Sequence, residues 1–234
     1  MSDYQSINEK FNHPQPTFDS ILSKTFSLYQ GVIGFAIGAG LLYVLLQLIL
    51  EVAFGIDDSQ YENIRNASDI LKIEGLGIYS SMSTVINLLL SPLYVGFIYV
   101  MNKFHNHQII EFSDLFIGYR QNLLQIILYS FLIYIILGIA FTLCFLPGLF
   151  VFPLLFLGYP ILLFENATAI DAIKKSYNIA INNYGTFFAV SIISCLLSFL
   201  GFFACCIGII ITMFFMCGTS YTTYVAFLGK PTSK

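Results

Sequence analysis

Polar residues inside long apolar stretches are the first candidates for chemistry in this sequence. Gln47 and Glu51 are four residues apart and share one face of a helix. Asn87, Ser91 and Pro92 form a second group. Polar groups at membrane depth, close to a helix opened by proline, are typical of transport pathways for a solute or a lipid. The alternative is that Gln47 and Asn87 pair between two helices while Glu51 reaches the membrane surface.

Three cysteines form a second candidate site. Cys144, Cys205 and Cys206 are all predicted at the outer surface, where an oxidising compartment would let Cys144 pair with Cys205 or Cys206. Free thiols packed among helices or facing lipid are the alternative. Cys195 and Cys217 are predicted to lie inside membrane spans.

Residues for catalysis are scarce. A catalytic metal site needs about three well-placed protein ligands, whereas the three histidines, His13, His105 and His107, are predicted in solvated cytoplasmic segments. The sequence has no glycine-rich phosphate loop and no nucleophile with a recognisable base. We therefore expect no catalytic, metal-binding or cofactor-binding residues, no cofactor, and a protein that is not an enzyme.

The composition predicts an environment in the lipid bilayer. Hydrophobic residues make up 57% of the chain, charged residues 10%, and the mean hydropathy is +0.81, whereas about a quarter of the residues in a soluble domain are charged. The net charge of −3, with ten Lys and Arg in 234 residues, provides no basic face for phosphates and argues against a nucleic-acid partner.

Six apolar stretches are predicted membrane spans, at 31–50, 79–101, 123–143, 149–164, 186–204 and 207–227. Twenty residues without a charge form the first, enough for about 30 Å of helix across the hydrocarbon. Within it, small residues predict close approach of another helix: Gly34 and Gly38, with Gly31, Ala36 and Gly40 nearby. Ordinary glycine enrichment in membrane helices is the alternative. Pro92 is expected to kink or open the second span. Pro147-Gly148 predicts a reversal before the fourth span, which Pro153 and Pro160 interrupt.

A short amphipathic pattern precedes each pair of spans. Each copy has an aliphatic residue, a small residue three positions later and then an aromatic residue: Leu22, Thr25 and Phe26; Leu115, Gly118 and Tyr119; Ile173, Ser176 and Tyr177. We expect each copy to form a helix in the membrane interface, starting a hairpin of two spans. Convergence of a short pattern, without true threefold repetition, is the alternative.

The predicted fold is all-α, with six transmembrane helices in three hairpins. Its parts are a polar N-terminus at 1–17, unit one at 18–104 with an outer loop at 55–77, unit two at 105–165, unit three at 166–228 and a C-terminus at 229–234. This topology places eight Lys and Arg on the side of the termini and two, Arg65 and Lys72, on the other. The bias predicts that both termini are cytoplasmic.

Several segments resemble a known family. Tyr159–Glu165, Ala169–Tyr184, a turn bearing Cys and Gly, and Thr212 resemble the bacterial YciC-like membrane proteins and the membrane domain fused to some glycerophosphodiester phosphodiesterases. Phe18–Tyr29 is similar to the opening helix of that family. Met213 stands where the family pattern has proline. The resemblance implies a six-helix protein of the bacterial inner membrane with an undefined biochemical role, and it carries over no phosphodiesterase residues.

Two functions are compatible with these observations. The first is a non-enzymatic membrane protein that organises or senses the bilayer, or serves as an accessory protein, with membrane lipids as partners. The alternative is a transporter or channel for a small solute or lipid that uses the polar groups of spans one and two. A homo-oligomer or a partner membrane protein is compatible with both.

Overall fold

The computed structural model of the chain describes residues 16–54, 76–143, 145–203, 208, 210 and 212–231, and the regular elements within these ranges are all helices. In chain order they are α2 (Phe18–Phe54), α4 (Leu76–His105), η2 (Phe112–Phe116), α5 (Ile117–Arg120), α6 (Leu123–Leu143), α7 (Phe145–Val151), η3 (Phe152–Leu155), α8 (Gly158–Glu165), α9 (Ala169–Asn182), α10 (Tyr184–Phe203) and α12 (Phe215–Leu228).

Five stretches of the described part are long and apolar enough to cross a membrane: Phe18–Ala53, Ile78–His105, Leu123–Leu143, Phe145–Glu165 and Tyr184–Gly201. The chain is therefore a helical membrane protein, as its composition predicts. The sixth predicted span, 207–227, lies partly outside the described residues and contains α12. Cys144, Cys205 and Cys206, the candidates for a disulfide, also lie outside them.

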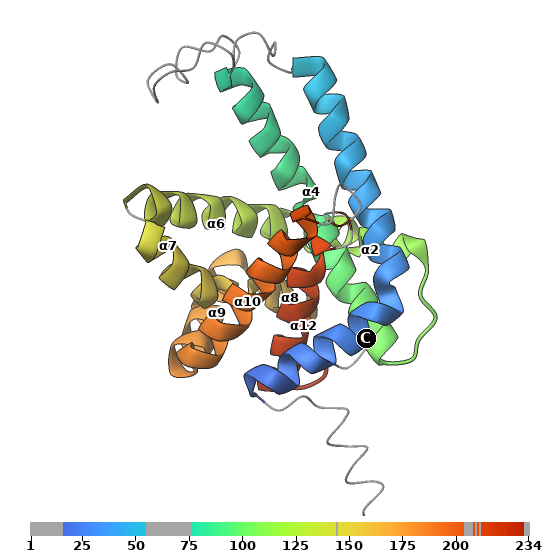
Figure 1. Cartoon of the computed structure of the whole chain (residues 1–234), viewed down its shortest axis with the longest axis vertical. Coiled ribbons are helices and arrows are strands. Elements are labelled where there is room, and N and C mark those ends of the chain that lie inside the picture. The colour runs from blue at the N-terminus through green and yellow to red at the C-terminus, as the bar shows by residue number, and fades with distance from the viewer. Residues whose placement is uncertain are drawn as a thin grey trace, which may run out of the picture.

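The first predicted interfacial helix and the first predicted span, 31–50, form one continuous helix, α2, and not two separate helices. The helix changes direction along its length instead (Figure 1). Gly31 lies beneath the ring of Phe104, where a Cβ would be 1.9 Å from Phe104 Cζ. The first turns of α2 pack on the bundle, because Thr25 is fully buried and its hydroxyl contacts that of Thr222 in α12.

The predicted glycine seam in α2 is shifted from its expected position. A Cβ at Gly34 would meet no atom of the described residues within 4 Å, and one at Gly38 would lie 3.0 Å from the ring of Phe112. The close backbone approach occurs at Gly40, where a Cβ would lie 2.9 Å from the carbonyl oxygen of Ile210. The predicted small residues of α2 thus allow close packing at Gly31 and Gly40, whereas Gly34 makes no close contact with the described residues.

Pro92 lies within α4 without ending the helix. A proline frees the carbonyl four residues earlier, which is Leu88 here, and the Ser91 hydroxyl donates to this carbonyl at 2.7 Å. The next carbonyl, that of Leu89, accepts from the Tyr119 hydroxyl at 2.9 Å. The carbonyls beside the proline therefore have partners, as a helix surrounded by lipid requires.

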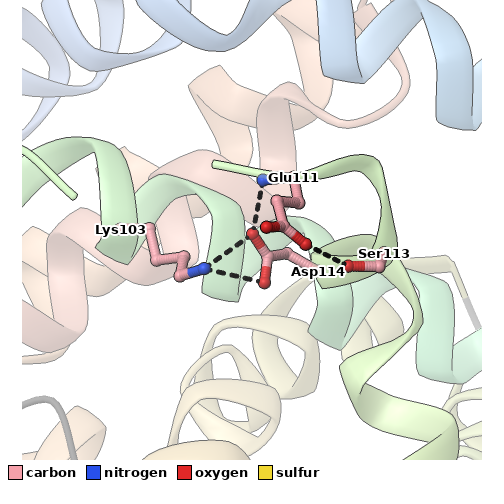
Figure 2. Close-up of polar contacts among 4 residues, drawn as sticks. All are labelled: Lys103, Glu111, Ser113 and Asp114. Atoms are coloured by element: carbon pink, nitrogen blue, oxygen red, sulfur yellow. Dashed lines mark hydrogen bonds and ion pairs between the residues drawn. The ribbon is translucent and has the colours of Figure 1, made fainter. Parts of the chain in front are cut away.

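The second predicted interfacial helix consists of two short helices, η2 and α5. Lys103, in the last turn of α4, forms an ion pair with Asp114 at 2.8 Å, and the Glu111 amide donates to the same carboxylate (Figure 2). Gly118 permits the close approach of α5 to α4, since a Cβ there would lie 2.4 Å from the Pro92 carbonyl oxygen. These contacts hold η2 and α5 against α4.

The fourth predicted span is divided into α7, η3 and α8. Proline at position 153 lies in the short 3₁₀ helix η3, in agreement with the predicted interruption. The reversal is predicted over Cys144–Gly148 from the turn signal Pro147-Gly148, but both of these residues lie in α7. The chain passes from α6 to α7 between Leu143 and Phe145, and Cys144 lies outside the described residues. Proline is tolerated in the first turn of a helix, where its missing amide would have no partner inside the helix.

The third amphipathic segment forms α9, with Thr168 as its N-cap. Ser176 is fully buried, donates to the Leu154 carbonyl at 2.7 Å and accepts from the Leu157 amide at 3.1 Å. In the following helix, α10, Tyr184 donates to the Phe150 carbonyl at 3.0 Å. Helix α9 and the start of α10 thus pack on the divided fourth span.

Helix α12 lies at the centre of the helical bundle and contacts α2, α4, α8 and α10. The last turns of α2 and the first turns of α4 extend together beyond the other labelled helices, whereas α6 runs sideways from them (Figure 1).

Candidate functional site

A pocket of about 340 Å³ lies between α4, α6, η3, α8 and the segment that includes α12. Its lining combines apolar side chains with uncharged polar ones: Asn87, Ser91, Tyr94, Ile98, Ser130, Ile133, Tyr134, Leu137, Phe152, Leu155, Phe156, Tyr159, Met213, Met216, Cys217 and Ser220. Asp, Glu, Lys, Arg and His are absent from this lining.

One face of α4 forms the first wall. Asn87, Ser91, Tyr94 and Ile98 follow one another at intervals of four, three and four residues, so they lie along one side of the helix. The ring of Tyr94 packs against those of Tyr159, at 6.2 Å between centroids, and of Phe214, at 5.8 Å. These contacts hold the Tyr94 side chain at the pocket.

The predicted polar residues of spans one and two are partly brought together. The Asn87 amide oxygen accepts hydrogen bonds from the Tyr43 hydroxyl and the Gln47 amide, the latter at 3.3 Å. The predicted pairing of Gln47 with Asn87 is thus confirmed, and Asn87 also reaches the pocket. Ser91 lies in the lining, whereas Glu51 is exposed near the end of α2.

The prediction missed residues contributed by other helices. Tyr94, Ser130, Tyr159 and Ser220 were not selected, although each provides a hydroxyl to the pocket lining. The spacing of polar residues on α4 was a usable signal, since extending the face of Asn87 and Ser91 by three residues reaches Tyr94. No comparable signal in the sequence pointed to the residues on α6, α8 and α12.

A second polar cluster lies at the other end of α4. His105 is 3% exposed, so its predicted placement in a solvated linker is wrong, whereas His107 is exposed as expected. The Tyr221 hydroxyl donates to the Asn102 side-chain oxygen and lies 3.0 Å from His105 Nδ1. Because that hydroxyl has one proton, Nδ1 carries the hydrogen between the ring and Tyr221.

This second cluster joins helices. The Lys230 amine donates to the His105 carbonyl at 2.9 Å, and burial lowers the pKa of Lys230. Within the described ranges, no group of three His, Cys, Asp or Glu residues is placed to hold a metal ion. The cluster thus connects the end of α4 to α12 and the segment after it.

No protein-family model, curated protein or solved structure matches this chain. Its function is therefore inferred from the pocket and the chemistry of its lining.

Proposed function

We propose that this is a non-enzymatic integral membrane protein that binds an uncharged molecule from the bilayer, as a sensor or accessory protein. The pocket is the observation that carries this proposal. Its volume, about 340 Å³, lies in the range of small-molecule pockets, about 300–1,000 Å³. Because its walls belong to apolar helices, a molecule dissolved in the bilayer can reach it without crossing water.

The hydroxyl groups of the pocket favour binding over catalysis. A serine nucleophile needs a neighbouring base to take its proton. Ser91, Ser130 and Ser220 instead donate to the backbone carbonyls of their surroundings, at 2.7, 2.9 and 2.6 Å. These protons stabilise helices and their contacts, and the lining offers no carboxylate or imidazole as a general base.

Photo-cross-linking tests whether the pocket binds a molecule. The full chain in nanodiscs of phosphatidylethanolamine and phosphatidylglycerol would receive an alkyl probe that carries a diazirine. We expect cross-links on the pocket-lining residues of α4 and α6. Ile133→Trp fills the pocket from α6 and should abolish these cross-links.

A matched variant controls for changes on the surface of α6. Ile135 lies two residues away, is 42% exposed and is not part of the lining. Ile135→Trp should leave the cross-links unchanged. Equal cross-linking in wild type and Ile133→Trp would refute binding in the pocket.

Transport is a second candidate function, and Asn87 favours it. This residue joins the pocket to Tyr43 and Gln47 on α2, so polar groups continue from the pocket along the α2–α4 pair. Proteoliposomes would be assayed for glycerol uptake and for movement of a fluorescent phospholipid between leaflets. Selective flux that is lost in Asn87→Ala and in Glu51→Gln would favour a transporter over a sensor.

The full topology is part of the proposal. We place six spans in a bacterial inner membrane, with both termini in the cytoplasm, which agrees with the charge bias and with the resemblance to YciC-like proteins. Accessibility labelling of Gln60→Cys in a variant that lacks the native cysteines tests the orientation. Labelling from the outer side supports it, and labelling from the cytoplasmic side contradicts it.

Three repeated units complete the proposal. Thr25, Gly118 and Ser176, the small residues of the three copies, contact α12, α4 and the η3 region respectively. The second and third copies therefore pack on the second span of the preceding unit, which is α4 for unit one and the divided fourth span for unit two. The first copy packs on α12, which belongs to the second span of unit three. This cyclic order supports threefold repetition, because unrelated amphipathic segments have no reason to choose equivalent neighbours.

A further inference from the structure

The chemistry of the pocket narrows the class of molecule that it can bind, provided that the pocket binds one as proposed above. A buried polar group needs a hydrogen-bond partner, so the groups that lack one inside the protein are available to a ligand. The donor protons of the hydroxyl and amide groups in the lining can be assigned one by one.

The serine and amide groups have partners within the protein. The protons of the Ser91, Ser130 and Ser220 hydroxyls go to backbone carbonyls. The Asn87 amide nitrogen donates to the Ser83 carbonyl at 2.8 Å, and its oxygen already accepts from two side chains. The second Asn87 N–H donates to the Ser83 hydroxyl oxygen at 3.4 Å, so the donor protons of these four groups are taken within the protein.

The Tyr159 hydroxyl is also occupied. It lies 2.9 Å from the Ser130 oxygen, and because Ser130 gives its proton to the Ile126 carbonyl, Tyr159 must donate to Ser130. The proton of Tyr159 therefore does not face a ligand.

Two phenol groups remain available. Within the described part of the chain, the Tyr94 and Tyr134 hydroxyls have no hydrogen-bond acceptor, and both residues line the pocket. Tyr134 is 50% exposed and lies at the rim on α6, whereas Tyr94 is held by the rings of Tyr159 and Phe214. The hydrogen-bond donors that remain available in the pocket are thus these two phenols, which suit a ligand that carries a hydrogen-bond acceptor.

The lining also restricts the charge and size of the ligand. An ionised group buried without a counter-charge is strongly disfavoured at membrane depth, and the lining contains no charged side chain. A volume of about 340 Å³ is near the lower end for small-molecule sites. The pocket therefore suits one chain or one small ring system, not a whole two-chain lipid.

We propose that the pocket binds an uncharged amphiphile through an acceptor oxygen, as in an ester or a quinone, which receives the Tyr94 hydroxyl proton. The apolar part of the ligand lies against Phe152, Phe156 and Met216. Tyr134 lies at the entrance from the hydrocarbon and offers a second donor as the oxygen passes.

Competition with the photo-cross-linking probe tests this proposal in the full chain in nanodiscs. The competitors are methyl tridecanoate, a decyl-substituted benzoquinone and tetradecane, which has no oxygen. We expect Tyr94→Phe to weaken competition by the oxygen-bearing molecules about three- to tenfold, as for the loss of one hydrogen bond. Tetradecane should compete equally in wild type and variant.

Tyr99→Phe is the control, because Tyr99 lies on the same helix outside the pocket lining. If Tyr94→Phe weakens competition by the ester alone, the ligand is an ester lipid. If it weakens competition by the quinone alone, the ligand is a quinone. Either result supports the role of Tyr94 as the hydrogen-bond donor. Unchanged competition by both in Tyr94→Phe, with cross-linking still blocked by Ile133→Trp, overturns the ligand class and leaves the binding function intact. Cross-linking that persists in Ile133→Trp refutes the binding function as well.

Discussion

The hydroxyl oxygens of Ser130 and Tyr159 lie 2.9 Å apart and connect α6 to α8 at the pocket wall. Ser130 is 1% exposed and already donates to the Ile126 carbonyl, so Tyr159 is the donor between them. The wall on this side of the pocket is therefore joined by a hydrogen bond between two helices.

Removing this hydroxyl should loosen the wall. Tyr159→Phe takes away one buried hydrogen bond and is expected to lower the free energy of unfolding by about 1 kcal/mol. Tyr134→Phe is the control, because that hydroxyl lies at the half-exposed rim. Thermal unfolding of both variants in detergent provides the measurement, and equal melting temperatures would show that the bond contributes nothing.

Gly96 permits the contact between α4 and η2. A Cβ at this position would lie 1.8 Å from the Leu115 carbonyl oxygen, which is a backbone atom and cannot rotate away. Gly96→Ala should therefore destabilise the protein by about 1–3 kcal/mol or more. Gly138→Ala on α6, where a Cβ would meet no described atom within 4 Å, should be neutral or stabilising. Yield of monodisperse protein and melting temperature distinguish the two variants.

Ser176 connects α9 to the divided fourth span. Its hydroxyl satisfies both the Leu154 carbonyl and the Leu157 amide. Ser176→Ala leaves these two buried groups without a partner and should cost about 1–3 kcal/mol. Lys174→Ala, on the exposed side of α9, is the control. Hydrogen exchange should rise at the Leu157 amide in the first variant only, and protection of that amide in Ser176→Ala would contradict the proposed role.

The Lys103–Asp114 and Lys175–Glu165 ion pairs should differ in strength. The side chains of Lys103 and Asp114 are 19% and 12% exposed, whereas those of Lys175 and Glu165 are 41% and 29% exposed. Solvent screening weakens exposed pairs. Double-mutant cycles with Lys103→Met and Asp114→Asn should give a coupling energy of about 1 kcal/mol, and the corresponding cycle for the second pair less than about 0.5 kcal/mol. A larger coupling in the second pair would show that burial does not determine their strength.

The pattern of apolar residues predicted most helices, and Pro153 predicted the interruption of the fourth span, but not every proline and glycine marks a break. Pro92 interrupts no hydrogen-bonded element, because the hydroxyls of Ser91 and Tyr119 satisfy the carbonyls beside it. Gly31, the first residue of the predicted first span, lies within a continuous helix and packs beneath Phe104. Proline and glycine have the same local signature whether they end a helix or allow a close contact, and only the neighbouring helix distinguishes the two cases.

By itself, the sequence determined that this is a helical membrane protein, since so many apolar residues in long runs cannot be buried within a soluble domain of this size. It also predicted that Gln47, Asn87 and Ser91 lie at membrane depth. Only the tertiary structure decided that Asn87 and Ser91 share a pocket with Tyr159 and Ser220. These residues are separated by up to 133 positions, from Asn87 to Ser220, and helical periodicity specifies the face of each helix but not the helix that it meets.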